Sequence, residues 1–193
     1  NLHKEFDAAT PTSTRALTKL LTVLGISAVE TAPYKIQLSL VSEADLGAEG
    51  YRLVIAENIQ ISAQTDVGLF YGVQTLKQLF PVNAQTSYQL PKITITDVPQ
   101  YAWRGSMVDV ARHFFSIDYV KKHVERMAAF KLNKLHLKRL SYAVITGAVN
   151  GSIIFLVLAR NLALYFKLRG FVLNLYPQHG HHNPSHFINI SHI

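Results

Sequence analysis

The distribution of acidic residues constrains this chain more than any other feature of its sequence. All 12 Asp and Glu residues lie at or before Glu125, and the 56 residues from Lys138 to Ile193 contain none. These 56 residues hold five of the 19 Lys and Arg residues, so they carry +5 of the formal net charge of +7. About a quarter of the residues in an ordinary domain are charged. The last 56 residues fall well below that share and include no acid, so the two parts of the chain differ in composition. A reaction that needs two carboxylates must therefore use residues before position 126.

The overall composition limits the fold and the kind of active site. A chain of 193 residues can form one ordinary domain or two small ones with a buried core. Hydrophobic residues make up 49% of it, which excludes a disordered or fibrous chain. The absence of cysteine excludes a disulfide scaffold, a zinc ribbon and a thiol nucleophile. Because the chain starts at Asn1 without a basic and then apolar leader, we expect a processed product or a fragment whose signal peptide has been removed.

Residues 1–97 alternate between helical and strand periodicity. Residues 1–12 have no clear pattern, and the stretch 42–50 is polar and typical of a loop. The other segments predict a helix that Ser13 or Thr14 caps and Gly25 ends, strands at 34–40, 51–55, 59–63 and 90–95, and a helix at 66–80 that Pro81 stops. The strands at 51–55 and 59–63 are close enough to form a hairpin around Glu57 and Asn58. We therefore expect an α+β N-terminal domain with an antiparallel sheet.

A second unit is predicted from residue 98 onwards. Its elements are a buried strand at 105–110, a helix at 118–130 that Asp118 caps, and a short strand at 133–137. A strand, a helix and a strand in this order form a βαβ unit, whose two strands are parallel. Because two strands cannot close a barrel, the strand at 133–137 should have an open apolar edge that makes the chain prone to aggregate.

The acid-free end, residues 138–193, cannot be assigned to a fold. Residues 143–159 carry no charge, and Lys138, Arg139 and Arg160 flank them. Three readings stay open: a buried helix or strand pair, which we favour, a membrane span, which is the least favoured, or a segment never selected to fold. Because the cations are dispersed among apolar residues, they form no basic stripe for nucleic acid.

Two groups of residues are candidates for chemistry. The first is a histidine-rich group near the C-terminus, which could bind a metal but is more typical of a flexible tail: His179, His181, His182 and His186. The second places Arg104 and Asp109 at the two ends of a strand, followed by Arg112 and His113. Functional groups gather at strand ends in a parallel α/β barrel, and a structural Arg–Asp pair explains the pattern equally well. No nucleophile-elbow, P-loop or dinucleotide-binding motif occurs.

Several motifs together resemble the family 20 glycoside hydrolases, the β-N-acetylhexosaminidases or chitobiases. The motifs are GYRL at 50–53, DVGLFYGVQTLKQL at 66–79, PQYAWRG at 99–105, DVARHF at 109–114 and MAAFKLNKLHL at 127–137. The resemblance implies that residues 1–97 are the N-terminal domain, that 98–137 begin a (β/α)8 catalytic barrel, and that 138–193 are a divergent tail. The family continues with His-Leu-(Ser/Thr)-Asp-Asp-Gln-Gly-Trp-Arg, where this chain has Lys138-Arg139-Leu140-Ser141-Tyr142. A frameshift, a retained intron or an alternative end would explain the break.

The resemblance also implies a chemistry and a site. In that family the substrate's 2-acetamido group is the nucleophile, an Asp orients it, and the adjacent Glu is the acid and base. It implies that Arg104 binds hydroxyls of the terminal sugar, and that Asp109, Arg112 and His113 build the rim. It further implies no metal and no cofactor, substrates that end in N-acetylglucosamine or N-acetylgalactosamine, and a periplasmic or secreted location. Since the catalytic Asp–Glu pair is missing, we expect no catalytic residue and no hydrolysis here. The alternative is a non-catalytic binding or membrane-associated protein that uses the α+β domain.

Overall fold

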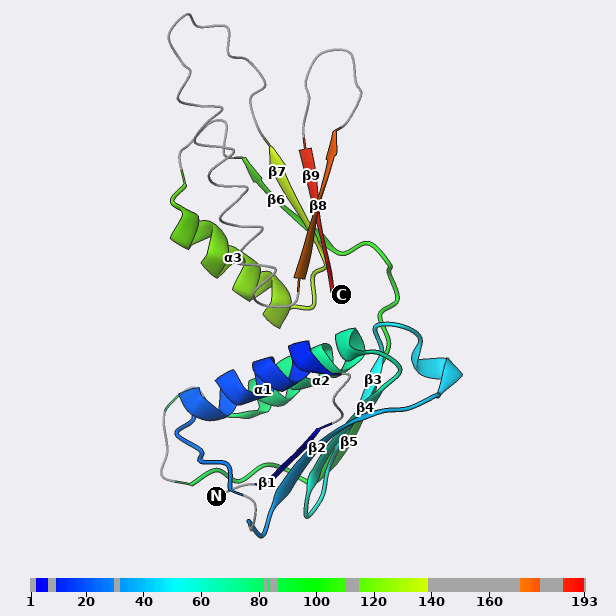
Figure 1. Cartoon of the computed structure of the whole chain (residues 1–193), viewed down its shortest axis with the longest axis vertical. Helices are drawn as coiled ribbons and strands as arrows, with labels where there is room; N and C mark the ends of the chain where they lie inside the picture. Colours follow the sequence, from blue (N-terminus) through cyan, green and yellow to red (C-terminus); the bar gives the residue numbers. More distant parts are fainter. Residues whose placement is uncertain are drawn as a thin grey trace, which may run out of the picture. The chain divides into compact units, whose positions relative to one another are not determined.

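The chain divides into two compact units, Asn1–Ala102 and Trp103–Ile193. The computed structural model describes residues 3–6, 10–29, 32–81, 83, 87–109, 115–138, 171–177 and 186–192 (Figure 1). The uncharged segment 143–159 lies outside the described residues. Among the described residues, none of the helices combines the length and the apolar character needed to cross a bilayer.

The first unit is built on a five-stranded sheet in the order β1-β2-β4-β3-β5. Its strands are β1 (His3–Phe6), β2 (Lys35–Leu40), β3 (Tyr51–Ile55), β4 (Ile59–Ala63) and β5 (Ile93–Asp97). The predicted hairpin is confirmed, because β3 pairs with β4 and also with β5 in antiparallel fashion. The prediction of an antiparallel sheet is thus confirmed for β3, β4 and β5, but the sheet is mixed, because β1 pairs with β2 and β2 with β4 in parallel. A helix connects β1 to β2, and a crossover of this kind returns the chain in the same direction.

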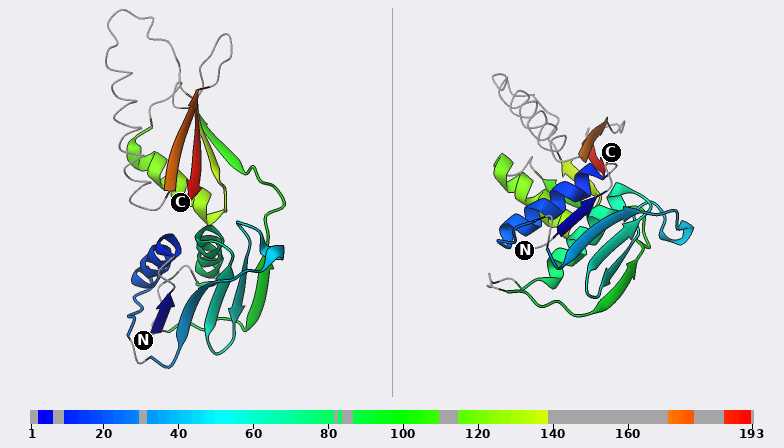
Figure 2. Two further views of the ribbon diagram at one scale, coloured as in Figure 1. Left: turned by 45° about the vertical axis from the view of Figure 1, so that its right-hand side comes forward. Right: turned by 60° about the horizontal axis from the view of Figure 1, so that its bottom comes forward.

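Two helices cover one face of this sheet: α1 (Pro11–Val23) and α2 (Asp66–Leu79) (Figure 2). Their apolar faces supply much of the core, with Leu17 and Leu21 of α1 and Leu69 and Leu76 of α2 all fully or almost fully buried. A Cβ atom added to Gly72 of α2 would overlap the side chain of Ile61. The helix therefore lies closer to the sheet than any larger residue at this position would allow.

Several boundaries of these elements differ from the predicted ones. The prediction that Ser13 or Thr14 caps α1 is wrong, because Thr10 is the N-cap residue and the helix begins at Pro11, where proline suits the first turn. A short 3₁₀ helix, η1 (Ala44–Leu46), lies in the stretch predicted as a loop. Strand β5 starts later than predicted and extends to Asp97. The prediction that Gly25 ends α1 is confirmed, because Gly25 adopts a φ of 68° and its N–H bonds to the carbonyl of Thr22.

The second unit contains the predicted βαβ arrangement. Strand β6 (Gly105–Asp109), helix α3 (Ile117–Ala129) and strand β7 (Lys134–Lys138) follow one another, and the two strands pair in parallel. Strand β6 was predicted to be buried, but Met107 is 60% exposed and only Val108 is buried. Successive side chains of a strand face opposite sides. Ser106 and Val108 therefore face α3, whereas Met107 and Asp109 lie on the other side.

The acid-free end adds two strands to this second sheet. Strands β8 (Phe171–Pro177) and β9 (His186–His192) pair in antiparallel fashion, and β9 also pairs with β7. The sheet order is β6-β7-β9-β8. The prediction of an open edge on the strand at 133–137 is therefore wrong, because β9 occupies that edge. An antiparallel neighbour at this place departs from a (β/α)8 barrel, in which all eight strands are parallel.

Candidate functional site

The carboxyl ends of β6 and β7 lie side by side at one edge of the second sheet. In the register of the two strands Met107 is opposite His136, and Asp109 is opposite Lys138. Partners in register on parallel strands share a face, so Met107, Asp109 and His136 lie on the face away from α3. Active sites of parallel α/β barrels are built at this carboxyl edge. Arg112 and His113, which follow β6, lie outside the described residues.

Arg104 lies at the opposite end of β6, directly before its first residue. With a rise of about 3.3 Å per residue, the five-residue strand separates Arg104 from the carboxyl edge by about 16 Å. Its Nε atom donates a hydrogen bond to the carbonyl oxygen of Lys131 at 2.8 Å. Arg104 and Asp109 thus lie at the two ends of the strand, as predicted. The predicted contact between Arg104 and a sugar stays a prediction.

The backbone of Arg104 is bound to the segment that leads from α3 into β7. Its N–H donates to Asn133 Oδ1 at 3.0 Å, and its carbonyl accepts from the N–H groups of Asn133 and Lys134 at 2.8 and 3.1 Å. Asn133 is only 8% exposed. Asn133 is not among the predicted site residues, because its partner is 29 residues away along the chain. The only indication in the sequence is a polar residue directly before an apolar strand.

A serine and a histidine meet on the other face of β6. Ser106 Oγ lies 3.0 Å from Nε2 of His123, which belongs to α3. Partial burial and then the positive charge of Arg126 lower the pKa of His123 from its ordinary value of 6.5. A neutral ring can accept the hydrogen bond of the serine hydroxyl. Because this pair lies between the strand and its helix, away from the face with Asp109, it joins α3 to β6 and takes no part in the edge site.

The other acidic residues of the second unit belong to α3. Ser116 caps this helix by accepting a hydrogen bond from the N–H of Tyr119 at 3.2 Å, so the prediction that Asp118 is the cap is wrong. The carboxylate of Asp118 instead lies 3.6 Å from Lys121 Nζ and is 77% exposed. Glu125 is exposed, as predicted. Asp109 is therefore the one carboxylate of this unit at the carboxyl end of a described strand.

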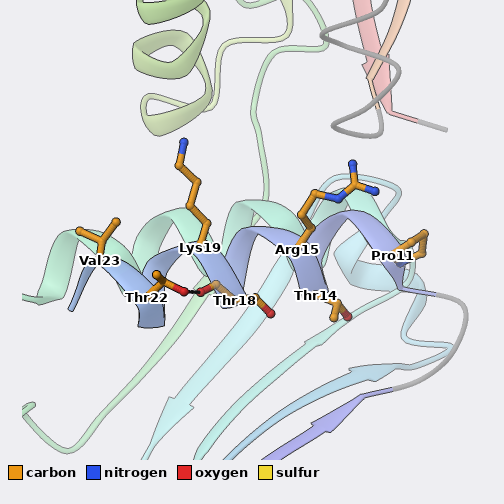
Figure 3. A pocket seen from close by; sticks show the side chains of 7 residues that line it. All are labelled: Pro11, Thr14, Arg15, Thr18, Lys19, Thr22 and Val23. Carbon is orange, nitrogen blue, oxygen red and sulfur yellow. Dashed lines mark hydrogen bonds between the residues drawn. The ribbon is translucent and has the colours of Figure 1, made fainter. Parts of the chain in front are cut away.

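A separate hollow lies over the outer face of α1 in the first unit. Its volume is about 610 Å³, and it is lined by Pro11, Thr14, Arg15, Thr18, Lys19, Thr22 and Val23. Figure 3 shows that Arg15 and Lys19 project away from the sheet. The lining contains cations and hydroxyls but no carboxylate or imidazole, so these residues could bind an anion or a sugar but offer no general acid or base.

The histidine-rich group can be placed only in part. His186 starts β9, and the other three predicted members lie outside the described residues. Within the described ranges, no three His, Cys, Asp or Glu side chains are grouped as they would be around a metal ion.

Two family models match the chain. Glycosyl hydrolase family 20, domain 2, matches residues 3–98, and the catalytic domain of the same family matches residues 101–140. A β-N-acetylhexosaminidase of Cellulomonas fimi is 40% identical over 107 residues, which are 55% of this chain and 22% of that protein. The N,N'-diacetylchitobiase of Vibrio harveyi is 44% identical over 81 residues, or 42% of this chain and 9% of that protein.

Solved structures agree with these matches. A family 20 β-N-acetylhexosaminidase from Streptomyces coelicolor A3(2) superimposes with a TM-score of 0.60 and 37% identity, and the match covers 72% of this chain and 30% of that one. A β-hexosaminidase of Streptomyces plicatus, solved with its product GlcNAc, gives a TM-score of 0.57 and 35% identity over 69% of this chain and 30% of that one. The chain thus spans less than a third of these relatives. On the family models, the sequence identities and the shared fold, this chain belongs to glycosyl hydrolase family 20.

Proposed function

We propose that this chain is part of a β-N-acetylhexosaminidase that acts on glycans with a terminal N-acetylhexosamine. The names of the relatives support this reaction, and the Streptomyces plicatus structure with bound GlcNAc supports the sugar. A terminal N-acetylgalactosamine is included in the proposal, because the two sugars differ only in the configuration of one hydroxyl group.

The observation that carries the proposal is the β6-α3-β7 unit with Asp109 at its carboxyl edge. This unit has the parallel pairing with which a (β/α)8 barrel starts, and the family's catalytic-domain model covers it. We therefore propose that residues 1–97 form the N-terminal domain, that residues 98–137 begin an incomplete barrel, and that residues 138–193 replace the barrel's next part.

We further propose that the chain does not hydrolyse the glycosidic bond by itself. The family's reaction, in which the acetamido group of the substrate attacks, needs one carboxylate to hold that group and a second as acid and base. Asp109 cannot fill both roles, and Asp118 and Glu125 lie on α3 rather than on the sheet. Beyond Glu125 the chain has no Asp or Glu that could form the family's catalytic Asp–Glu pair.

The test is the release of 4-nitrophenol from its N-acetyl-β-D-glucosaminide by the purified chain. We expect no turnover above buffer, because general acid–base catalysis of this kind contributes about 10²–10⁴-fold. Turnover that disappears in Asp109→Ala would contradict the argument from the carboxylates. Turnover that survives Asp109→Ala would indicate contamination by a complete enzyme, which a second purification by size would remove.

A non-catalytic binding function has one observation in its favour, the hollow over α1. Arg15, Lys19 and three threonine hydroxyls could bind a sugar or an anion there. All lining residues come from one helix, so the hollow has no opposing wall of described residues, and we consider this function second. Binding of N-acetylglucosamine that is lost in the Arg15→Ala, Lys19→Ala double variant but kept in Asp109→Ala would favour it.

A further inference from the structure

We infer that Arg104 is a positioning residue: it holds the turn between α3 and β7 and so sets the register of β7 against β6. The cluster that does this consists of Arg104, Lys131 and Asn133. The importance of this register for a substrate rests on the function proposed above. The register itself, however, is a property of the fold and can be measured without any activity.

Lys131 adopts an unfavourable backbone conformation at the end of α3. Its φ of 58° lies in the left-handed region, and among the described residues it is the only one other than glycine with a positive φ. Two hydrogen bonds form the usual helix ending there, from Lys131 N–H to the carbonyl of Ala128 and from Leu132 N–H to that of Met127. Glycine is the usual residue at this position. Here a lysine occupies it, and the Nε of Arg104 binds its carbonyl at 2.8 Å.

Asn133 completes the connection to β6. Its side-chain oxygen accepts the N–H of Arg104, and its own N–H donates to the carbonyl of Arg104, so the two residues bind one another in both directions. These bonds place Gly105 opposite Lys134, the first pair of the parallel register. A shift of one residue would turn the fully buried Leu135 away from α3. It would also change the residue that stands beside Asp109 at the carboxyl edge.

The register can be read by disulfide trapping, because the chain contains no cysteine. Met107→Cys with His136→Cys joins register partners, whose strands lie about 4.8 Å apart. Met107→Cys with Lys134→Cys is displaced by two residues, about 6.6 Å along the strand, which moves the Cα atoms beyond the range of a disulfide. We expect mild oxidation to cross-link the first pair and not the second.

The same pairs are then tested in an Arg104→Ala, Asn133→Leu background. We expect the first cross-link to decrease and the second to appear. The single variant Asn133→Asp retains Arg104 and keeps the side-chain acceptor, so it should give the cross-link pattern of the parent. An unchanged cross-link pattern in the double variant would overturn the inference.

A second measurement covers the case in which the double variant does not fold. Lys131→Gly removes the conformational need for Arg104, because glycine adopts a positive φ readily. Arg104→Ala should therefore lower the urea midpoint less in the Lys131→Gly background than in the parent. Equal shifts in the two backgrounds would contradict the role of Arg104. Neither measurement uses the 4-nitrophenol assay, so a failure of the proposed function leaves this result interpretable.

Discussion

Replacing Asp66 by alanine should destabilise the first unit more than any other change of a charged residue there. Asp66 is the first residue of α2, yet its carboxylate binds the start of α1. It accepts hydrogen bonds from the N–H groups of Thr12 and Ser13 at 2.8 and 3.0 Å and also from the Ser13 hydroxyl. Thr10, the N-cap residue of α1, makes no capping bond through its side chain. The carboxylate of Asp66 therefore supplies the cap that the α1 sequence does not.

The magnitude follows from the groups that would lose their partner. Thr12 is 4% exposed and Ser13 is fully buried, so water cannot replace the carboxylate. An unsatisfied buried N–H costs about 1–3 kcal/mol, and a lost helix cap costs about 1 kcal/mol. We expect Asp66→Ala to lower the free energy of unfolding by about 3–5 kcal/mol. Asp66→Asn keeps one acceptor and should cost about half as much.

Urea denaturation followed by circular dichroism at 222 nm measures this loss, because α1 and α2 supply helical signal. Tryptophan fluorescence would not, since the single tryptophan, Trp103, lies in the second unit. The control is Glu43→Gln, which removes a surface ion pair with Arg52 at 3.1 Å and should cost less than about 1 kcal/mol. If Asp66→Ala cost no more than this control at an unchanged m-value, the proposed capping of α1 by Asp66 would be refuted.

Three further predictions concern packing and pH. Tyr51 is only 1% exposed, and its hydroxyl donates a hydrogen bond to Asp97 at 3.0 Å. Tyr51→Phe removes this hydroxyl, and urea denaturation should show a free energy of unfolding that is lower by about 1–3 kcal/mol. Gly72→Ala adds a methyl group that overlaps Ile61, and the same melts should show a loss of about 1–3 kcal/mol, whereas an unchanged midpoint would mean that α2 can move away from the sheet. Because the pKa of His123 is lower in the folded second unit than in the unfolded chain, the urea midpoint of this unit should be highest above pH 6.5 and fall as the pH drops below that value. His123→Gln should remove this pH dependence of the midpoint. A pH dependence that persists in His123→Gln would assign it to another group.

The periodic part of the fold could be predicted from the residues alone. Strands β2, β3 and β4 alternate between apolar and polar side chains, and α2 and α3 repeat their apolar residues at helical spacing. Strand β1 was missed because its four residues, His-Lys-Glu-Phe, show no alternation that distinguishes a strand from a loop. Its pairing depends on the parallel register with β2, which is a tertiary contact and has no pattern in the local sequence.

The candidate site was harder to predict for a similar reason. The positions of Arg104 and Asp109 at the two ends of β6 could be predicted, because the apolar run between them marks the strand. The contacts that the residues around this strand make could not. Asn133 binds the backbone of Arg104, and His123 binds the side chain of Ser106, although they lie 29 and 17 residues away from these partners along the chain. Contacts of this kind follow from packing, and no local motif encodes them.

The motifs that define the family have different tasks in the two units. In the first unit Tyr51, Asp66 and Gly72 all belong to these motifs, and each has a partner or a close contact inside the unit. They stabilise the fold, so their presence argues for the fold and not for hydrolysis. In the second unit the edge that holds Asp109 depends on what stands beside it, and there β7 ends at Lys138, where the family has a histidine. An assay of folding and an assay of turnover therefore test different stretches of this chain, and success in the first would not predict success in the second.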